Sequence, residues 1–346
     1  MRAARYYGNQ DVRIDEIDAP SPGPGEVLID VDACGICGSD LSEYLYGPRR
    51  DDDEFLPYTM GHEFGGTVAV AGEGVDLDVG TPVGVNPLVA CEDCWCCDEA
   101  EYNLCRNLRV IGAHRQGAYA EQVVAPATNV IPLPDGVTPE DAAVAEPITV
   151  AYHGLLESPL RPGDSVSVVG MGPIGLGMVQ LADAMGASPI VASGHREIRR
   201  DLARECGADV VVDPRETDLT ERVDEVTEGG VDVAFEIAGN ESALNDAIKS
   251  TKAGGHTTVL GVFKGPVEID PMDFVNSERS IGGSAAYETG PLADRDFGVV
   301  FDMLASGELD PDPLVTSRVP LDDIVDDGFE ALADRDRGQV KVLIKP

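Results

Sequence analysis

The sequence has few basic residues. Its 346 residues include 25 Lys and Arg against 63 Asp and Glu, and only five of the basic residues are lysines. The formal net charge of −38 at pH 7 would repel both a nucleic-acid backbone and the anionic face of a membrane. We therefore expect no nucleic-acid partner and no membrane partner.

The excess of acidic residues indicates a protein from a salt-rich cytoplasm. Repulsion among so many carboxylates destabilises a compact chain at low salt, where charges interact over long distances. At about 1 M salt the screening length falls to ~3 Å and this penalty fades. We therefore predict a halophilic source, and we interpret the acidic run at 51–54 as a solvated loop.

Long apolar stretches are also missing. The longest ones fall well short of the ~18 residues that a membrane-spanning helix needs. Residues 1–18 lack the apolar core of a secretory signal, so we expect a cytoplasmic protein in a reducing compartment. The eight cysteines then indicate metal binding or catalysis before disulfides.

The length and the residue pattern predict two domains, since domains average about 150 residues. Residues 1–147 are rich in Gly, Pro and short β-branched runs, which is typical of strands and loops. Residues 148–286 alternate buried strands with helices, which predicts a doubly wound parallel sheet. We expect residues 287–346, which are helical with a closing strand, to return to the first domain.

One loop contains four cysteines in the order C-x2-C-x2-C-x7-C. Four thiolates at this spacing match a closed, tetrahedral and therefore structural zinc site. Buried or disulfide-bonded cysteines are the alternative, which a reducing cytoplasm disfavours. We interpret Cys34 and Cys206 as packed bystanders, and Cys96 as a bystander that is able to substitute for a neighbour. The predicted zinc ligands are Cys91, Cys94, Cys97 and Cys105.

A second group of metal-ligating residue types is spread over the first domain. Cys37 lies in the segment CGICGSD, and His62 and Glu63 come 25 residues later. Glu146 lies in an otherwise apolar run. Each is a weak signal alone, because lone residues of these types usually belong to the core. Together they supply one soft and two harder ligands, the mixed set that leaves a zinc ion open for catalysis.

A glycine-rich turn follows the predicted buried strand SVSVV. Gly170, Gly172 and Gly175 form the pattern G-x-G-x-x-G at the start of a predicted helix. Such a turn places backbone N–H groups and a helix N-terminus against a pyrophosphate. A glycine turn without a ligand is the alternative. The predicted dinucleotide-binding residues of this turn also include Pro173 and Ile174.

The end of the next strand decides between the two nicotinamide cofactors, because an acidic residue there normally binds the ribose 2′-hydroxyl of NAD. Gly194 occupies this position and removes the repulsion toward a 2′-phosphate. Arg196 can bind that phosphate, helped by Ser193, His195 and Arg199. We therefore predict NADP over NAD. The alternative is that the two arginines pair with acids on their own helix, which would make NAD equally usable.

The segment GHEFGGTVAVAGEGV reads as G-H-E-x2-G-x5-G-x2-V and resembles the signature of zinc-dependent medium-chain alcohol dehydrogenases. With CGICGSD, the four-cysteine loop, AEP and the glycine-rich turn, the resemblance covers essentially the whole chain. The chain is most similar to the butanediol, sorbitol and threonine dehydrogenase branch, because of CGICGSDLSEYLYGP and the Glu of AEP. The resemblance implies an α/β fold, with a GroES-like, mostly-β catalytic domain and a Rossmann doubly wound cofactor domain.

The resemblance also implies the ligands of the catalytic zinc. Cys37 and His62 are two of them, and either Glu63 or Glu146 is the third, because related enzymes differ on this point. Asp40 would accept a hydrogen bond from the ring nitrogen of His62 that does not bind the metal, and would thereby fix its tautomer.

Two serines are assigned to proton transfer by the same resemblance. Ser39 lies at the Ser/Thr position that takes the proton of the substrate hydroxyl. Ser42 stands where relatives commonly carry a histidine that relays the proton to bulk water. A serine holds a water molecule but is no base near pH 7, so we expect the proton to leave through water or another group.

The implied function is a reversible hydride transfer between a secondary alcohol, diol or polyol and NADP. The resemblance implies two zinc ions per subunit, a small-molecule substrate and a homodimer or homotetramer, with the sheet extended near SIGGSAAY. A sugar 1-dehydrogenase or a threonine dehydrogenase is the alternative within the family. A zinc-binding structural or interaction protein would explain the four-cysteine loop alone.

Overall fold

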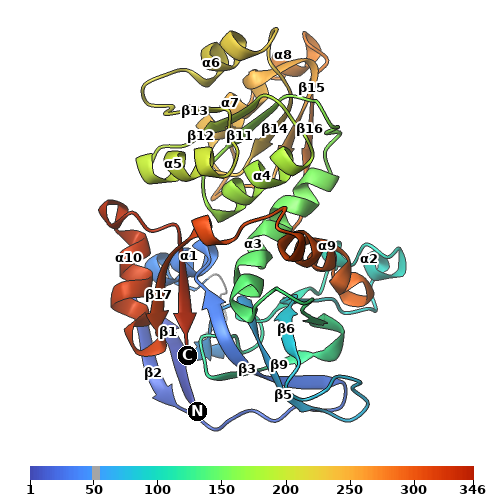
Figure 1. Ribbon diagram of the computed structural model, residues 1–346, viewed down its shortest axis with the longest axis vertical. Helices are drawn as coiled ribbons and strands as arrows, with labels where there is room; N and C mark the ends of the chain where they lie inside the picture. The colour runs from blue at the N-terminus through green and yellow to red at the C-terminus, as the bar shows by residue number, and fades with distance from the viewer. Residues whose placement is uncertain (49–54) are drawn as a thin grey trace. The chain divides into compact units, whose positions relative to one another are not determined.

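The computed structural model describes residues 1–48 and 55–346, so the acidic run at 51–54 lies outside the described residues. These residues form two compact units (Figure 1). The first unit consists of Met1–Glu146, Glu288–Gly307 and Val315–Pro346. The second unit consists of Pro147–Tyr287 and Glu308–Leu314.

The first unit is built mainly from β-strands. Its largest sheet has the order β10-β6-β5-β3-β18-β17, with β9 paired to β3, and a smaller sheet has the order β2-β1-β4. The C-terminal strand β18 runs antiparallel to β3, so the two ends of the chain belong to one unit. Its strands are β1 (Arg2–Gly8), β2 (Asp11–Glu16), β3 (Glu26–Gly35), β4 (Tyr58–Thr59), β5 (Glu63–Ala71), β6 (Pro82–Val85), β7 (Leu88–Val89), β8 (Arg109–Val110), β9 (Gln122–Pro126), β10 (Val130–Pro132), β17 (Val315–Pro320) and β18 (Lys341–Lys345).

Helices of the first unit lie at the edges of these sheets and in the loops between strands. The predicted helix near the C-terminus is irregular, because residues Ile324–Phe329 adopt a π-helix before a single α-helical turn. The α-helices are α1 (Gly38–Tyr46), α2 (Trp95–Asp98), α9 (Ala293–Ser306) and α10 (Glu330–Ala333), and α3 (Pro139–Leu156) continues from the first unit into the second.

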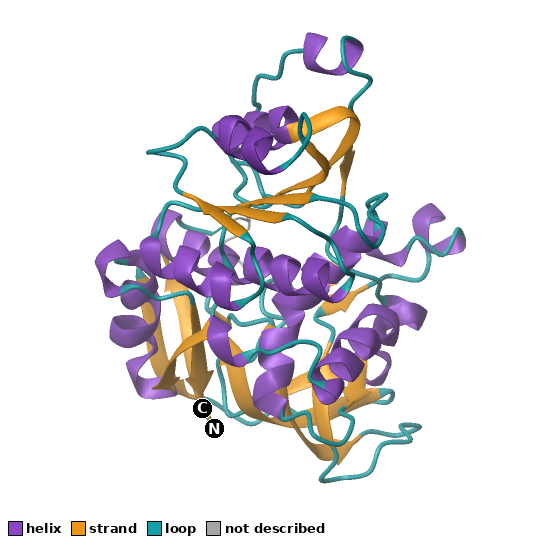
Figure 2. Ribbon diagram, turned by 45° about the horizontal axis from the view of Figure 1, so that its top comes forward, coloured by secondary structure: helices purple, strands orange, loops and turns teal. Residues whose placement is uncertain are grey.

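The second unit contains one parallel sheet with the strand order β13-β12-β11-β14-β15-β16, whose strands are labelled in Figure 1. Figure 2 shows strands in orange and helices in purple. The strands β11 and β12 are buried along their whole length, which explains their near-continuous apolar sequence. The sheet consists of β11 (Val166–Val169), β12 (Ile190–Ser193), β13 (Val210–Val212), β14 (Val231–Glu236), β15 (Thr251–Val259) and β16 (Ser280–Gly283).

Helices connect the successive parallel strands of this sheet. They are α4 (Pro173–Ala184), α5 (Glu197–Glu205), α6 (Leu219–Val226), α7 (Glu241–Ser250) and α8 (Met272–Val275). The strand order reverses between β11 and β14, and parallel sheets of this kind bind ligands at the carboxyl ends of the strands beside such a reversal. The predicted α/β fold, with a mostly-β part and a doubly wound parallel sheet, is confirmed. None of the described helices has the length and apolar character required to cross a bilayer.

Candidate active site and cofactor-binding turn

The structure brings together three of the four predicted ligands of the catalytic metal. One ligand atom each from Cys37, His62 and Glu63 lies within 4.8 Å of the others. Cys37 is the N-cap of α1, His62 precedes β5, and Glu63 is the first residue of that strand. A thiolate, an imidazole and a carboxylate are the ligand types of a catalytic zinc site, so these residues fit the ion.

The beginning of α1 is shaped around Cys37. Its Sγ accepts a hydrogen bond from the Ser39 N–H at 3.4 Å, and its own N–H donates to Asp40 Oδ2 at 3.4 Å. This reciprocal arrangement is a capping box. Ser42 lies one turn further along α1 and is partly buried. The predicted proton-transfer serines therefore lie on the helix whose N-cap is the predicted metal ligand Cys37.

Asp40 faces the side of His62 that carries Nδ1. The Asp40 Oδ1 and His62 Nδ1 atoms are 3.4 Å apart, and Asp40 is 4% exposed. Burial raises the pKa of the Asp40 carboxyl, but the charge and hydrogen bond of His62 outweigh burial and hold that pKa below its usual range. Burial lowers the pKa of His62, but the charges and hydrogen bonds of Asp40 and Cys37 have the larger effect. The pKa of His62 is therefore raised well above its usual value.

Glu63 is paired with a buried lysine that the sequence analysis did not identify. The Lys341 Nζ forms an ion pair with Glu63 Oε2, and both side chains are about 1% exposed. The same ammonium donates to the Ile36 carbonyl at 3.1 Å. Gly35 makes room for the pair, since a Cβ at this position would overlap the Glu63 carboxylate. Burial lowers the pKa of Lys341, but the charges of Glu63 and Cys37 raise it above its usual value.

Glu146 lies in α3 immediately before Pro147 and is 7% exposed. It is absent from the three-residue group that the described residues form around Cys37. Its carboxylate contributes to the raised pKa of Lys341, so it lies within electrostatic reach of the lysine that pairs with Glu63. In this conformation Glu63 is therefore the carboxylate grouped with the cysteine and histidine.

The four cysteines of the second predicted site also converge. The Sγ atoms of Cys94 and Cys97 are 3.6 Å apart, those of Cys94 and Cys105 3.9 Å, and those of Cys105 and Cys91 3.4 Å. Zn–S bonds of about 2.3 Å in a tetrahedron require S···S distances of about 3.8 Å. Backbone N–H groups lower the pKa of Cys94 to about 6, which favours the thiolate. These donors fit a closed zinc site.

The remaining cysteines lie outside both groups. Cys34 is fully buried, and burial raises the pKa of its thiol well above its usual value. Cys206 accepts a hydrogen bond from Gln180 Nε2 at 3.5 Å, and burial raises the pKa of its thiol to about 11. Cys96 is buried in α2 beside the four-cysteine group without belonging to it.

The glycine-rich turn joins β11 to α4. Gly170 has φ +113°, a conformation that favours glycine, and a Cβ at Gly175 would overlap the Gly170 carbonyl oxygen. Pro173 occupies the first turn of α4, where its missing N–H costs no hydrogen bond, and Ile174 follows it. The backbone N–H groups at this helix N-terminus form a suitable site for a pyrophosphate.

The end of β12 lies beside this turn and carries the predicted 2′-phosphate residues. A Cβ on Gly172 would lie 4.0 Å from Arg199 Nη1, so the Arg199 guanidinium reaches over the glycine-rich turn. Burial lowers the pKa of Arg199 to about 10, and the charge of Arg196 adds to this effect. Ser193 is buried at the last position of the strand, and His195 is exposed in the loop that follows.

Two further arginines, which the sequence analysis did not identify, hold this loop. Arg200 Nη1 donates to the carbonyls of Gly194 at 3.1 Å and His195 at 2.9 Å. Arg215 Nη2 donates to the His195 carbonyl at 2.6 Å. Both arginines are paired with Asp213, at 2.8 and 2.6 Å. Hydrogen bonds from Arg215, stronger in effect than burial, lower the pKa of the Asp213 carboxyl, which therefore stays ionised and neutralised.

Comparisons with known proteins assign the family. Residues 23–135 match the alcohol dehydrogenase GroES-like domain and residues 173–306 match the zinc-binding dehydrogenase domain. The chain is 38% identical to the (R,R)-butanediol dehydrogenase of Bacillus subtilis (strain 168), with all of both chains covered. The chain belongs to the zinc-binding alcohol dehydrogenase family.

Other members of the family differ in what they act on and bind. The L-threonine 3-dehydrogenase of Pyrococcus furiosus is 35% identical, with 100% of this chain and 98% of the relative covered. A zinc-binding dehydrogenase from Sinorhizobium meliloti 1021, solved with NADP, has a TM-score of 0.90 at 35% identity and covers 100% and 99% of the two chains. An alcohol dehydrogenase from E. coli CFT073, solved with NADH, has a TM-score of 0.90 at 29% identity with the same coverage.

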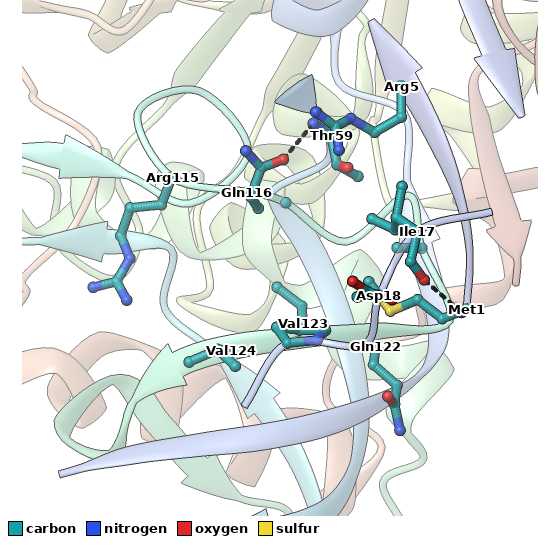
Figure 3. A pocket seen from close by; sticks show the side chains of 13 residues that line it. Met1, Arg5, Ile17, Asp18, Thr59, Arg115, Gln116, Gln122, Val123 and Val124 are labelled. Carbon is teal, nitrogen blue, oxygen red and sulfur yellow. Dashed lines mark hydrogen bonds between the residues drawn. The ribbon is translucent and has the colours of Figure 1, made fainter. Parts of the chain in front are cut away.

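This alcohol dehydrogenase also has a cavity of about 290 Å³ in its first unit (Figure 3). Its lining includes Met1, Arg5, Asp18 and Gln116. The residues that line it include none of the predicted metal ligands or cofactor-binding residues.

Proposed function

We propose that this alcohol dehydrogenase interconverts a secondary alcohol, diol or polyol and the corresponding ketone, and that it prefers NADP. The observation that supports this most directly is the convergence of Cys37, His62 and Glu63 within 4.8 Å. The proposal includes two zinc ions per chain, a catalytic one at this group and a structural one at the four cysteines. A zinc-binding interaction module would need only the second site.

A zinc ion held at this group would supply Lewis acidity toward the alcohol oxygen, and a bound nicotinamide cofactor would supply the hydride acceptor. Cys37 and His62 hold the ion, together with Glu63 or Glu146. Three protein ligands leave one position for a substrate. The ion pair with Lys341 favours a weakly held Glu63, which leaves room for Glu146 to take its place.

In this proposal the serines of α1 transfer the proton of the substrate hydroxyl. Ser39 Oγ accepts the proton from the substrate hydroxyl and passes it on. Ser42 Oγ holds a water molecule further along the relay, because a serine hydroxyl is no base near pH 7. Asp40 keeps the Nδ1–H tautomer of His62, so that the other ring nitrogen is available to the metal.

The preference for NADP rests on the end of β12. A 2′-phosphate requires positive charge and tolerates no unpaired carboxylate nearby. Asp213 lies beside this loop but is neutralised by Arg200 and Arg215. Arg196 and Arg199 supply the charge for the phosphate, and Arg199 lies close to the glycine-rich turn.

Substrate class and cofactor are tested together by an initial-rate panel in about 2 M salt. The panel compares butanediol, sorbitol, glucose, threonine and simple alcohols with NADP and with NAD. We expect the highest kcat/KM for a diol or polyol with NADP. Threonine or glucose oxidised at least about tenfold faster than the others would favour the alternative reaction, which the 35% identity to a threonine dehydrogenase supports. Higher rates with NAD would refute the cofactor preference.

A further inference from the structure

A buried tyrosine hydroxyl is hydrogen-bonded to the carboxylate that faces the metal-binding histidine. Tyr119 Oη donates to Asp40 Oδ2 at 2.7 Å, and lies 3.1 Å from the Gly35 carbonyl. The other carboxylate oxygen, Oδ1, faces His62 Nδ1 at 3.4 Å. Both oxygens of Asp40 are thus engaged, and two buried side chains, Tyr119 and Asp40, form a continuous row with the partly buried His62, a predicted metal ligand.

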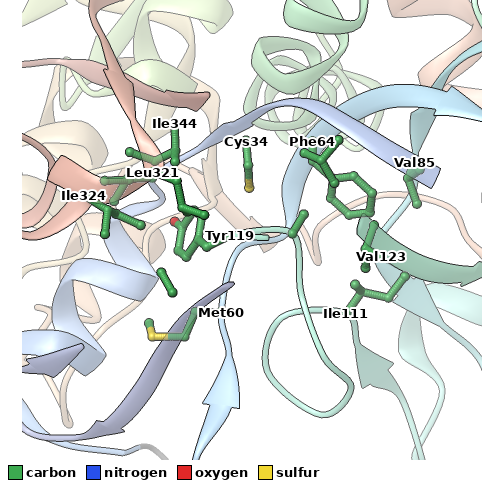
Figure 4. Packing of buried hydrophobic residues seen from close by; sticks show 14 of the residues in the cluster. Cys34, Met60, Phe64, Val85, Ile111, Tyr119, Val123, Leu321, Ile324 and Ile344 are labelled. Carbon is green, nitrogen blue, oxygen red and sulfur yellow. The ribbon is translucent and has the colours of Figure 1, made fainter. Parts of the chain in front are cut away.

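The position of the tyrosine ring is fixed by its surroundings. Tyr119 is 1% exposed and lies among Met60, Leu321 and Ile324 in the core of the first unit (Figure 4). Phe329 packs against it edge to face, with ring centroids 6.0 Å apart. A ring held on several sides keeps its hydroxyl at one place, which is what a positioning group requires.

The backbone next to His62 also touches this ring. Gly61 has φ +96°, and a Cβ on it would lie 2.8 Å from Tyr119 Cδ1. The residue before the predicted ligand is therefore in close contact with the same tyrosine that holds Asp40. The Tyr119 ring therefore contacts the main chain next to His62, and its hydroxyl binds the carboxylate that faces the His62 side chain.

We propose that Tyr119 is a positioning residue for the metal-binding His62 and acts through Asp40. Its O–H donates to Oδ2, which also accepts the more distant Cys37 N–H at 3.4 Å, and Oδ1 remains directed at His62, which fixes the orientation of the imidazole. Carboxylates that orient metal-binding histidines contribute about 10- to 100-fold to metal affinity, and a group one step further out should contribute less. This inference rests on the proposed function, since it requires a metal ion at Cys37, His62 and Glu63.

The test compares Tyr119→Phe with Tyr6→Phe. Tyr6 is equally buried in the same core, and its hydroxyl donates to the Glu43 carbonyl at 2.9 Å and not to Asp40. Each variant therefore loses one buried hydroxyl, but only one of them loses a contact to Asp40. Zinc affinity at each of the two sites is measured by competition with a chelator, and the cobalt-substituted protein reports the coordination geometry by its visible spectrum.

We expect Tyr119→Phe to weaken zinc binding at the Cys37 site by about 5- to 10-fold and to shift the cobalt spectrum. Zinc at the four cysteines should be unchanged in this variant, and Tyr6→Phe should change neither site. Asp40→Asn should weaken the Cys37 site more, and adding Tyr119→Phe to it should have no further effect, because the tyrosine acts through the carboxylate.

Three results would overturn the inference. They are a Cys37-site affinity within twofold of the wild type in Tyr119→Phe, an equal loss in Tyr6→Phe, and an undiminished effect of Tyr119→Phe in the Asp40→Asn background. A wild-type chain that binds zinc at the four cysteines alone would refute the proposed function as well. The count of zinc ions in the wild type therefore separates failure of the inference from failure of the function.

Discussion

At the scale of single residues, Gly194 has a steric role in addition to the electrostatic one. A Cβ at this position would lie 2.9 Å from Met171 Cγ, which is closer than real Cβ contacts, and 3.0 Å from Met171 Cβ, which is tighter than most of them. Met171 lies between the first two glycines of the cofactor-binding turn. A side chain at position 194 would therefore push on the turn itself, whatever its charge.

This contact determines how the cofactor preference is tested. The double variant Gly194→Asp with Arg196→Leu should lower the ratio of kcat/KM for NADP over NAD by about 10- to 100-fold, the effect of losing one charge-assisted hydrogen bond. Gly194→Ala is the control, because it introduces the same Cβ without a charge. It should weaken both cofactors and leave their ratio within about threefold. An unchanged ratio in the double variant would show that the 2′-phosphate is recognised elsewhere.

The sequence predicted those site residues that belong to short motifs. Cys37, His62 and Glu63 were identified from local segments, and the fold brings their ligand atoms together. Lys341 and Tyr119 were not identified, because their importance depends on partners far away in the sequence. Lys341 lies 278 residues from Glu63, and Tyr119 lies 79 residues from Asp40. For Lys341, the one signal available in the sequence was a lysine inside the otherwise apolar closing strand.

At the scale of secondary-structure elements, we expect the four-cysteine loop to depend on a metal for its order. The helix α2 has four residues, and the strands β7 and β8 that flank the loop have two residues each. Such short elements bury little apolar surface and are marginal by themselves. The four cysteines converge within this loop, so zinc bound there would contribute directly to the stability of the fold.

Removing one thiolate should therefore destabilise the protein. We expect Cys94→Ser to lower the free energy of unfolding by at least about 2 kcal/mol, because a closed metal site loses a ligand. Cys96→Ser is the matched control, since Cys96 is buried in the same short helix outside the metal-binding group. Urea unfolding in about 2 M salt measures the difference. Equal stability of the two variants would contradict a structural zinc at this loop.

The regular elements of the second unit were the easier part of the fold to predict. Strands such as β11 and β12 are buried on both faces, so their sequence is almost continuously apolar and gives a strong signal. The π-helical turn at Ile324–Phe329 was not predicted, because its α-helical pattern of apolar residues hides the extra residue per turn. Local pattern determines which element forms, and tertiary packing determines its detailed geometry.

At the scale of the whole molecule, we expect stability to depend on charge repulsion, because the formal net charge is −38 at pH 7. Paired one to one, the 25 basic residues would neutralise fewer than half of the 63 acidic residues. Several of the described ion pairs have both partners exposed, and such pairs contribute about 0–1 kcal/mol each. The repulsion among the remaining carboxylates must therefore be screened by salt ions in the solvent. The cytoplasmic location and the homodimer or homotetramer also remain predictions.

The melting temperature should rise with salt. Between about 0.1 M and 2 M potassium chloride we expect screening to add a few kcal/mol, which corresponds to roughly 10 °C for a chain of this size. Calorimetry measures the change, and glycerol in place of salt is the control for effects other than screening. A melting temperature that does not depend on salt would contradict the halophilic interpretation.

The most direct measurement of the central claim is the number of zinc ions per chain, determined together with turnover in the wild type and in Cys37→Ser. If Cys37, His62 and Glu63 hold a catalytic ion, the wild type binds two zinc ions. Cys37→Ser should then retain one ion and an unchanged unfolding midpoint, while its turnover falls by at least about 1,000-fold. A Cys37→Ser variant that retains two zinc ions and wild-type turnover would contradict the assignment of this site.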